Sequence, residues 1–159
     1  MFLDDKIYKE IMEYSIIPAV DVLFISDKHK ILLWLRDNKP LKWIYYFPWG
    51  RIEKWETIKQ AAVRKMAEEL WYQIDINRLE FLNVYDDIFN ESIYSWTTLQ
   101  NVTITYVYLL HSNEIISSKP HDSQHNKIKF FDVHDDTLDD RVKIRIKDLL
   151  NSNILNNDD

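Results

Sequence analysis

Apolar and polar positions alternate along this chain in patterns that predict several strands. Residues 17–26, IPAVDVLFIS, form a nearly continuous apolar run typical of a buried strand. A short polar turn leads to a second predicted strand at residues 31–36, ILLWLR. Further strands are expected at 79–86, at 102–110, where apolar side chains alternate, and at 128–133.

Helical periodicity marks three other segments. Asp4 or Asp5 could cap a helix that runs to Tyr14, and an amphipathic helix is expected over residues 137–150. A third helix is expected after residue 57, because apolar side chains recur there at every fourth position. This stripe consists of Ile58, Ala62, Met66 and Leu70. Strands and helices in this order predict an α/β fold, an α/β/α sandwich with a mixed sheet.

Length and composition bound the class of protein. A chain of 159 residues can bury one continuous core, so we expect one domain over residues 1–150 and a frayed tail at 151–159. Cysteine is absent, no apolar run approaches the ~20 residues that span a bilayer, and the N-terminus lacks a signal-peptide pattern. We therefore expect a cytoplasmic protein without membrane contact.

The net charge of −6 argues against a nucleic-acid partner, because such proteins usually carry a basic surface. A small acidic substrate is still compatible with this charge, provided that metal ions and a few arginines offset the negative charge of the ligand.

Residues 50–72, GRIEKWETIKQAAVRKMAEELWY, place charged side chains off the apolar stripe. Gly50 opens a loop, Glu56 follows it, and Arg64 precedes the pair Glu68 and Glu69 on the predicted helix. Arg64 and Glu68 are one helical turn apart and can pair, so Glu69 points toward whatever the preceding loop binds. A solvated charged helix is the alternative. The common register of all five residues favours a site for a hard divalent cation.

This spacing resembles the Nudix box, a loop and helix that bind divalent metal. Lys65 stands where the usual box has a glutamate, and Trp71 where it ends on glycine. The stretch ILLWLRDNKPLKWIYYFPWGRIEKWET is similar to the GDP-mannose mannosyl hydrolase branch of that family. The opening MFL, Asp21, SIYSWTT near residue 95, Tyr106 and the pair Gln124–His125 agree with it as well, so the likeness covers about residues 1–133.

The resemblance implies a magnesium-dependent hydrolase, with manganese as a possible substitute, that attacks the sugar carbon of GDP-mannose and works as a homodimer. One metal ion would be held by Glu69, Gln124 and the backbone carbonyl of Trp49, and Glu68 could restore a second metal site. His125 would be the general base. The remaining roles fall to Arg36, Arg51 and Tyr106, which would stabilise the leaving diphosphate, and to Asp21, which would help to hold the nucleotide and its loops.

Several alternatives stay open. His125 could be an ordinary loop histidine, Tyr106 a core aromatic residue and Arg36 a surface charge. Asp21 is harder to dismiss, because an unpaired buried carboxylate is costly. The chain could also be a pyrophosphohydrolase that attacks phosphorus, with Glu68 completing a second metal site, or a Nudix domain that binds a nucleotide sugar without turnover.

The sequence has a single glycine but six tryptophans, whereas glycine usually makes up about 7% of a protein. By resemblance, each tryptophan stands where the family commonly has glycine. They are Trp34, Trp43, Trp49, Trp55, Trp71 and Trp96. Either tryptophan has replaced glycine in the written sequence, or the chain is a real variant with a remodelled site. We prefer the first explanation, and an intact mass would separate the two.

Overall fold

The computed structural model describes residues 3–70, 72–94, 96–112, 114 and 128–156. Its helices are α1 (Asp5–Tyr14), α2 (Ile58–Leu70) and α3 (Asp140–Asn151), with short 3-10 turns η1 (Ile76–Arg78) and η2 (Ile154–Asn156). Its strands are β1 (Ile17–Ser26), β2 (Lys30–Leu35), β3 (Tyr45–Tyr46), β4 (Trp49–Arg51), β5 (Glu80–Phe89), β6 (Leu99–Leu110) and β7 (Ile128–Asp132).

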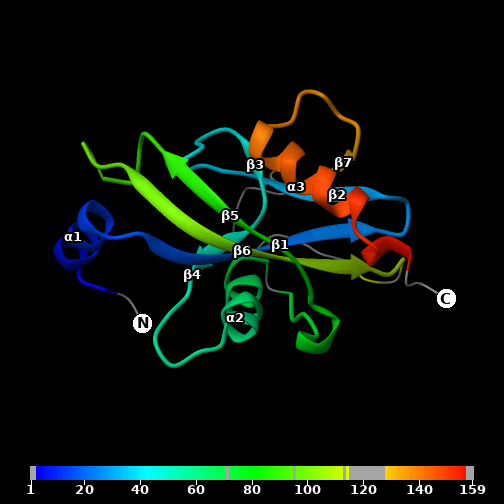
Figure 1. Cartoon of the computed structure of the whole chain (residues 1–159), viewed down its shortest axis with the longest axis horizontal. Helices are drawn as coiled ribbons and strands as arrows, with labels where there is room; N and C mark the ends of the chain where they lie inside the picture. The colour runs from blue at the N-terminus through cyan, green and yellow to red at the C-terminus, as the bar shows by residue number, and fades with distance from the viewer. Residues whose placement is uncertain (1–2, 71, 95, 113, 115–127, 157–159) are drawn as a thin grey trace.

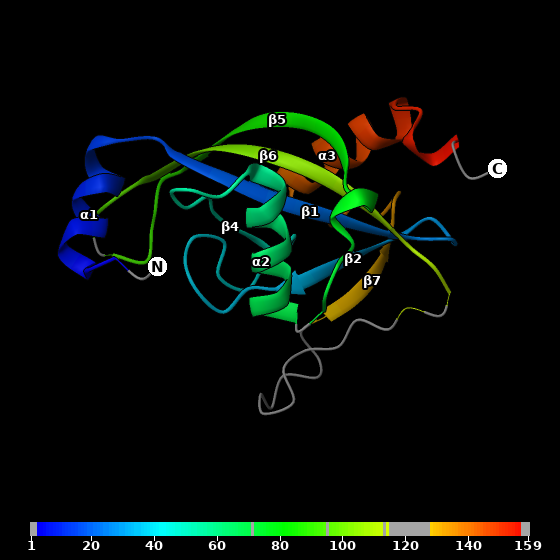
Figure 2. The ribbon, with the colours of Figure 1, turned by 90° about the horizontal axis from the view of Figure 1, so that it is seen from below.

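The described strands form one mixed sheet. Its order is β3-β2-β1-β6-β5, with β4 paired to β1 and β7 paired to β2. Strands β1 and β6 run parallel, whereas the other pairs are antiparallel. Helices α2 and α3 cover opposite faces of the sheet (Figure 1), and α1 lies at one end of it (Figure 2). This arrangement confirms the predicted α/β/α sandwich.

Strand β1 is central because both of its faces are apolar. Val22 and Phe24 pack toward α2, in a core that includes Met66. Leu23 and Ile25 point the other way, into a core closed by the apolar face of α3. A strand that is buried on both faces reads as a continuous apolar run, which is why its bounds could be predicted from the sequence.

The structure differs from the expected elements in several places, including the short strands β3 and β4, which were not expected. Ile58 is exposed at the start of α2, so the buried stripe of that helix begins later than predicted. Strands β5 and β6 are longer than expected. The tail is ordered as far as Asn156, because Ile154 is buried in the core under α3. Within the described residues, no helix is long and apolar enough to cross a bilayer.

Three tryptophans have a backbone conformation that favours glycine. Trp43, Trp55 and Trp96 have φ angles of 67°, 70° and 67°, and these residues are 65%, 99% and 103% exposed. A left-handed conformation costs a residue with a Cβ atom about 1–2 kcal/mol, and these exposed rings gain little packing in return. Trp34 and Trp49 lie within strands β2 and β4, and Trp71 is outside the described residues.

Candidate functional site

A cleft of about 430 Å³ lies where β4 and α2 meet α1 and the loop that follows β5. Its charged lining residues, called the charged wall below, include Arg36, Arg51, Arg64, Lys65, Glu68 and Glu69. Its aromatic and apolar lining residues, called the aromatic wall, are Leu3, Tyr8, Trp49, Ile93 and Tyr94, and Asp5 also lines the cleft. A cleft that presents both charged and aromatic side chains suits a ligand that carries both phosphate and an aromatic ring.

Glu56 and Arg64 fasten the loop after β4 to α2. The Arg64 guanidinium donates to both Glu56 carboxylate oxygens, at 2.9 and 2.6 Å, and also to the Arg51 carbonyl at 3.0 Å. Glu56 in turn accepts a hydrogen bond from the Glu53 amide at 2.6 Å. The hydrogen bonds from Arg64 hold the pKa of Glu56 below its ordinary value. These two box residues therefore position the loop.

Lys65 lies between the two glutamates of the box helix. Its ammonium is 3.2 Å from a Glu68 oxygen and 3.0 Å from a Glu69 oxygen. Burial opposes the charge on Lys65, but the two carboxylates outweigh it and raise the pKa of the amine. The Lys65 stem lies directly over Gly50, so a Cβ atom at position 50 would push this flexible side chain aside. Gly50 therefore lets Lys65 lie close against β4.

The donor chemistry of the charged wall fits a hard divalent cation. Glu68 and Glu69 already converge on one positive charge, that of Lys65. Among the described residues, no three His, Cys, Asp or Glu side chains come together as a metal site. Any further ligands would therefore have to be backbone or amide carbonyls and water, which magnesium accepts readily. Trp49, whose backbone carbonyl is one candidate for such a ligand, lines the same cleft.

Arg36 and Arg51 reach the cleft from two different segments. The Arg36 guanidinium lies 5.2 Å from the centre of the Trp49 ring and donates to the Pro40 carbonyl at 2.8 Å. Its burial lowers the pKa of this guanidinium, against the opposing effect of Glu69. Arg51 lies 5.7 Å from the Tyr8 ring centre. The structure thus places both arginines in the same cleft as Glu68 and Glu69.

Asp21 does not line the cleft, which corrects its expected contact with the nucleotide. It is fully buried on the α3 side of the sheet, with a carboxylate oxygen 3.0 Å from Arg145 Nε. Arg145 also contacts Asp87 at 2.7 Å. Burial raises the pKa of Asp21 to about 6, although Arg145 opposes this shift. Among the described residues, the connection of Asp21 to the cleft is its backbone, which pairs with Trp49 between β1 and β4.

Tyr106 also lies outside the cleft, in agreement with the alternative that it is a core aromatic residue. Its side chain is buried on the α2 face of the sheet. The ring packs edge-on against Phe81 at a centroid distance of 6.3 Å, and the Lys59 ammonium lies 5.7 Å from its centre. The remaining predicted site residues, Gln124 and His125, fall outside the described residues.

The sequence did not reveal the contact between α1 and the loop after β5. Tyr8 and Tyr94 pack edge to face with ring centroids 6.3 Å apart, and the Tyr94 hydroxyl donates to Asp5 at 3.1 Å. Tyr94 belongs to the motif SIYSWTT, which was the one available signal. Nothing in the local pattern pairs that motif with the first helix.

Comparison with known proteins agrees with this geometry. The model of the NUDIX domain matches residues 16–150. An ADP-ribose pyrophosphatase from Methanocaldococcus jannaschii is 45% identical over 53 residues, an alignment that spans 33% of this chain and only 31% of that relative. The chain thus matches less than two thirds of this relative's length.

Solved structures share the fold at low sequence identity. A MutT protein from Methanosarcina mazei Go1 has a TM-score of 0.67 at 14% identity, covering 86% of this chain and 94% of the other. The NUDIX domain of Shewanella oneidensis NrtR, complexed with ADP ribose, has a TM-score of 0.63 at 19% identity, covering 94% and 98%. Since the domain match extends over most of the chain and includes the box just described, the chain belongs to the Nudix family.

Proposed function

We propose that this protein is a magnesium-dependent hydrolase of a nucleoside diphosphate sugar. We further propose that its substrate is GDP-mannose, cleaved to GDP and mannose by attack of water on the anomeric carbon. The observation that supports this most is the cleft itself, which is lined by a pair of carboxylates, two arginines and several aromatic side chains. A nucleotide sugar has the matching parts, namely a diphosphate and an aromatic base.

The arginines suit the diphosphate part of such a ligand. Arg36 and Arg51 both line the cleft, and a guanidinium can donate two parallel hydrogen bonds to phosphate oxygens. Arg36 is fixed by its hydrogen bond to Pro40, so little freedom would be lost when it binds phosphate. Their positive charge would stabilise the diphosphate as it leaves the sugar.

Magnesium would be held by Glu69, by the Trp49 carbonyl and by Gln124, with Glu68 as a further carboxylate, and manganese could replace it. When bound, the ion would neutralise charge on the leaving diphosphate. His125 would accept the proton of the attacking water, because imidazole transfers protons near neutral pH. The assignments of Gln124 and His125 rest on the resemblance described above, which also supports a homodimer.

Attack at carbon is favoured over attack at phosphorus by Lys65. This lysine replaces a box carboxylate, and its ammonium engages both remaining ones, at 3.2 and 3.0 Å. Attack at phosphorus normally draws on several metal-bound carboxylates to position water. Attack at carbon needs only a stabilised leaving group and a base beyond the sugar.

A second candidate is a pyrophosphohydrolase that cleaves at phosphorus. It is supported by the relative named ADP-ribose pyrophosphatase, which is 45% identical over 53 residues, and by Glu68, which could complete a second metal site. A third candidate is a domain that binds nucleotide sugars without turnover, since Lys65 occupies the carboxylates that a metal ion would need.

Product analysis separates the three candidates. The protein is incubated with GDP-mannose and magnesium, and in parallel with ADP-ribose, and the products are separated by ion-exchange chromatography. GDP and mannose support the proposal, whereas GMP and mannose 1-phosphate support attack at phosphorus. Binding of GDP-mannose without any product supports the third candidate. Turnover of ADP-ribose alone would overturn the proposed substrate.

A further inference from the structure

Helix α2 covers only part of the sheet face on which it lies. It packs over the later part of β6, where Tyr106, Tyr108 and Leu110 are buried. Earlier on the same side of β6, Val102 and Ile104 are only half-buried. Figure 2, which views the sheet from the α2 side, shows β5 beyond this helix, with no described helix in front of it.

The strand registers place further apolar side chains beside these two. Val84 of β5 pairs with Ile104, and Pro18 of β1 pairs with Val102. Because paired residues of neighbouring strands point to the same side of a sheet, their side chains form one surface. We name this surface the open face, and its members are Pro18, Phe81, Val84, Ile88, Val102 and Ile104.

The open face is strongly exposed for an apolar surface. Phe81, Val84 and Ile88 are 57%, 47% and 59% exposed, and all three lie on β5. Single apolar residues are common on protein surfaces, but a contiguous apolar area marks a place where another molecule binds. A partner is therefore expected on this side of β5.

The partner packs on the face of β5 and does not extend the sheet at its edge. Two backbone groups of this edge strand are already bound by side chains. The Val84 amide donates to the Asn83 side chain at 2.9 Å, and Arg141 donates to the Ile88 carbonyl at 3.4 Å. An added strand would have to displace both contacts, whereas a surface laid on the open face displaces neither.

The charges around the open face match those of a second copy of this chain. At one end, the Lys59 ammonium lies 5.7 Å from the centre of the Tyr106 ring, which packs against Phe81. Toward the other end, Asp86 is exposed on the same side of β5. A two-fold axis that crosses the strands at Val84 would lay the two β5 strands antiparallel, one over the other.

This two-fold arrangement sets Lys59 of each copy opposite Asp86 of the other, so both pairs of charges are complementary. A two-fold axis along the strands would instead set Lys59 against Lys59 and Asp86 against Asp86. Charge thus selects the first arrangement.

We propose that two copies of this chain pack face to face through their open faces. The inference names a surface for the homodimer of the proposed function and rests on that part of it. Two sheets packed in this way bury the apolar side chains of both copies between them. The six residues of the open face are separate from those that line the cleft, so each copy keeps its own site.

Sedimentation velocity of the whole protein tests this inference. The wild-type protein should sediment as a dimer at micromolar concentration. Val84→Lys sets two ammonium groups together at the two-fold axis and should raise the dissociation constant of the dimer about a hundredfold. The matched control is Ile144→Lys, which is 52% exposed on α3 at the other side of the sheet and should leave the dimer unchanged.

An exchange of charges tests the two-fold arrangement. Lys59→Glu and Asp86→Lys should each weaken the dimer about tenfold, because each sets like charges opposite one another, and the two changes together should restore it. Lys59 also donates to the Leu79 carbonyl at 2.8 Å, so thermal unfolding first shows that each variant is folded.

A monomeric wild-type protein would overturn the inference, as would a dimer that survives Val84→Lys. A double exchange that leaves the dimer weak would overturn the two-fold arrangement. Sedimentation is measured without substrate, so these results are separate from those on the reaction. A dimer broken by Val84→Lys in a protein that forms GMP from GDP-mannose would overturn carbon attack alone. Release of GDP and mannose by a monomer would overturn the packing of open faces and leave the reaction standing.

Discussion

Two clusters in this protein place one cation between two carboxylates, and they differ mainly in their exposure to solvent. In the cleft cluster, Lys65 lies between Glu68 and Glu69, whose side chains are 51% and 34% exposed. In the buried cluster, Arg145 lies between Asp21 and Asp87, whose side chains are 0% and 5% exposed. The same arrangement of charges can therefore hold the fold together where it is buried, or remain available to a ligand where it is exposed.

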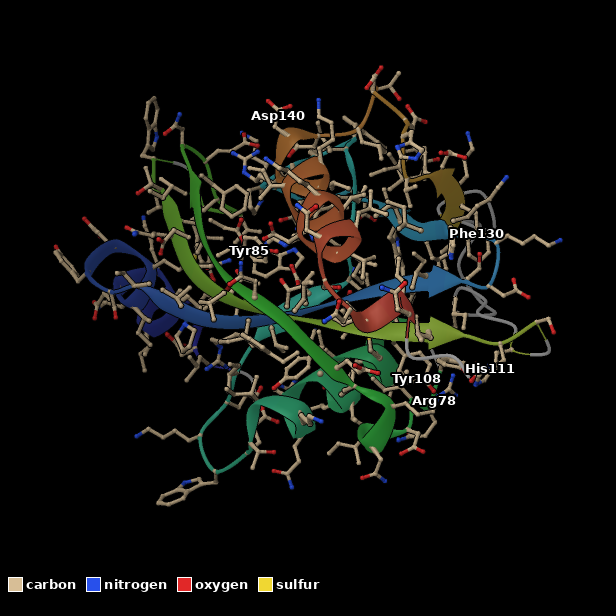
Figure 3. The ribbon with its side chains drawn as sticks, turned by 45° about the vertical axis from the view of Figure 1, so that its right-hand side comes forward. Arg78, Tyr85, Tyr108, His111, Phe130 and Asp140 are labelled. Carbon is tan, nitrogen blue, oxygen red and sulfur yellow. The ribbon has the colours of Figure 1, made fainter. Side chains whose placement is uncertain are left out.

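The buried cluster cannot exchange its cation. Arg145 donates to Thr105 at 3.2 Å and to the Arg141 carbonyl at 3.3 Å, and its guanidinium lies 4.2 Å from the centre of the Tyr85 ring. Figure 3 shows Tyr85 on the α3 side of the sheet, away from Arg78 and Tyr108. Charges removed from water this completely must stay paired. The glutamates of the cleft cluster keep contact with water, so the proposed metal ion can replace Lys65 as their partner.

The largest effect is expected when the buried cluster loses its cation. Arg145→Met leaves two buried carboxylates unpaired and should lower the free energy of unfolding by about 3–5 kcal/mol. Denaturant titration measures this loss. Arg141→Met, on the same helix but partly exposed beside Asp139, should cost less than about 1 kcal/mol. Equal losses in the two variants would mean that burial does not distinguish the clusters.

In the cleft cluster, loss of one carboxylate should affect activity and spare the fold. Glu69→Gln removes the charge of a proposed metal ligand without creating a cavity, so turnover of GDP-mannose at saturating magnesium should fall about a hundredfold or more. The free energy of unfolding should stay within about 0.5 kcal/mol of the wild-type value. Glu80→Gln on β5 is the control and should change neither quantity. Near wild-type turnover in Glu69→Gln would remove Glu69 from the metal site.

Removal of the cation from the cleft cluster should help a metal ion to bind. The Lys65 ammonium repels a divalent cation bound to the same glutamates. Repulsion between two positive charges this close together at a protein surface costs on the order of 1–4 kcal/mol. Lys65→Met should therefore tighten magnesium or manganese binding about tenfold in a calorimetric titration. The control is Lys59→Met. Lys59 lies on the same helix, but its ammonium donates to the Leu79 carbonyl at 2.8 Å, so metal affinity should not change in this variant. Weaker metal binding in Lys65→Met would show that the lysine supports the site.

The smallest effect on stability is expected in the loop after β4, which Glu56 and Arg64 fasten to α2. Trp55 lies in that loop with a φ of 70° and a fully exposed ring. Trp55→Gly should raise the free energy of unfolding by about 1 kcal/mol, because glycine adopts this conformation without strain. Trp34→Gly, within β2 and packed against the α2-side core, should lower it. A loss of stability in Trp55→Gly would contradict the view that glycine suits this position.

The sequence predicted features that depend on neighbours along the chain. Strand β1 was placed correctly because its apolar run is continuous, and the pairing of Arg64 with Glu68, now at 3.4 Å, follows from helical spacing. The sequence pattern does not show that the Asp21 side chain points toward α3, because this depends on the residue with which it pairs. That residue, Arg145, lies on a helix near the other end of the chain.

Contacts between distant segments explain the other differences. Asp5 and Tyr94 are 89 positions apart, and no local pattern brings them to one cleft. The side of the sheet that Tyr106 faces depends on the register between β6 and β1, which an alternating pattern leaves open. Helical spacing therefore identified the charged residues of α2, and the family resemblance added Arg36, Arg51 and Trp49, whereas the contact between α1 and the loop after β5 emerged only from the assembled fold.

The central claim is that the cleft cluster serves cleavage at the sugar carbon, and hydrolysis of GDP-mannose in oxygen-18 water tests it most directly. Mass spectrometry of the separated products locates the label. The proposed reaction predicts oxygen-18 in mannose and none in GDP, with both label incorporation and turnover lost in Glu69→Gln. Label in a phosphate group of the products would contradict it and would place the attack at phosphorus.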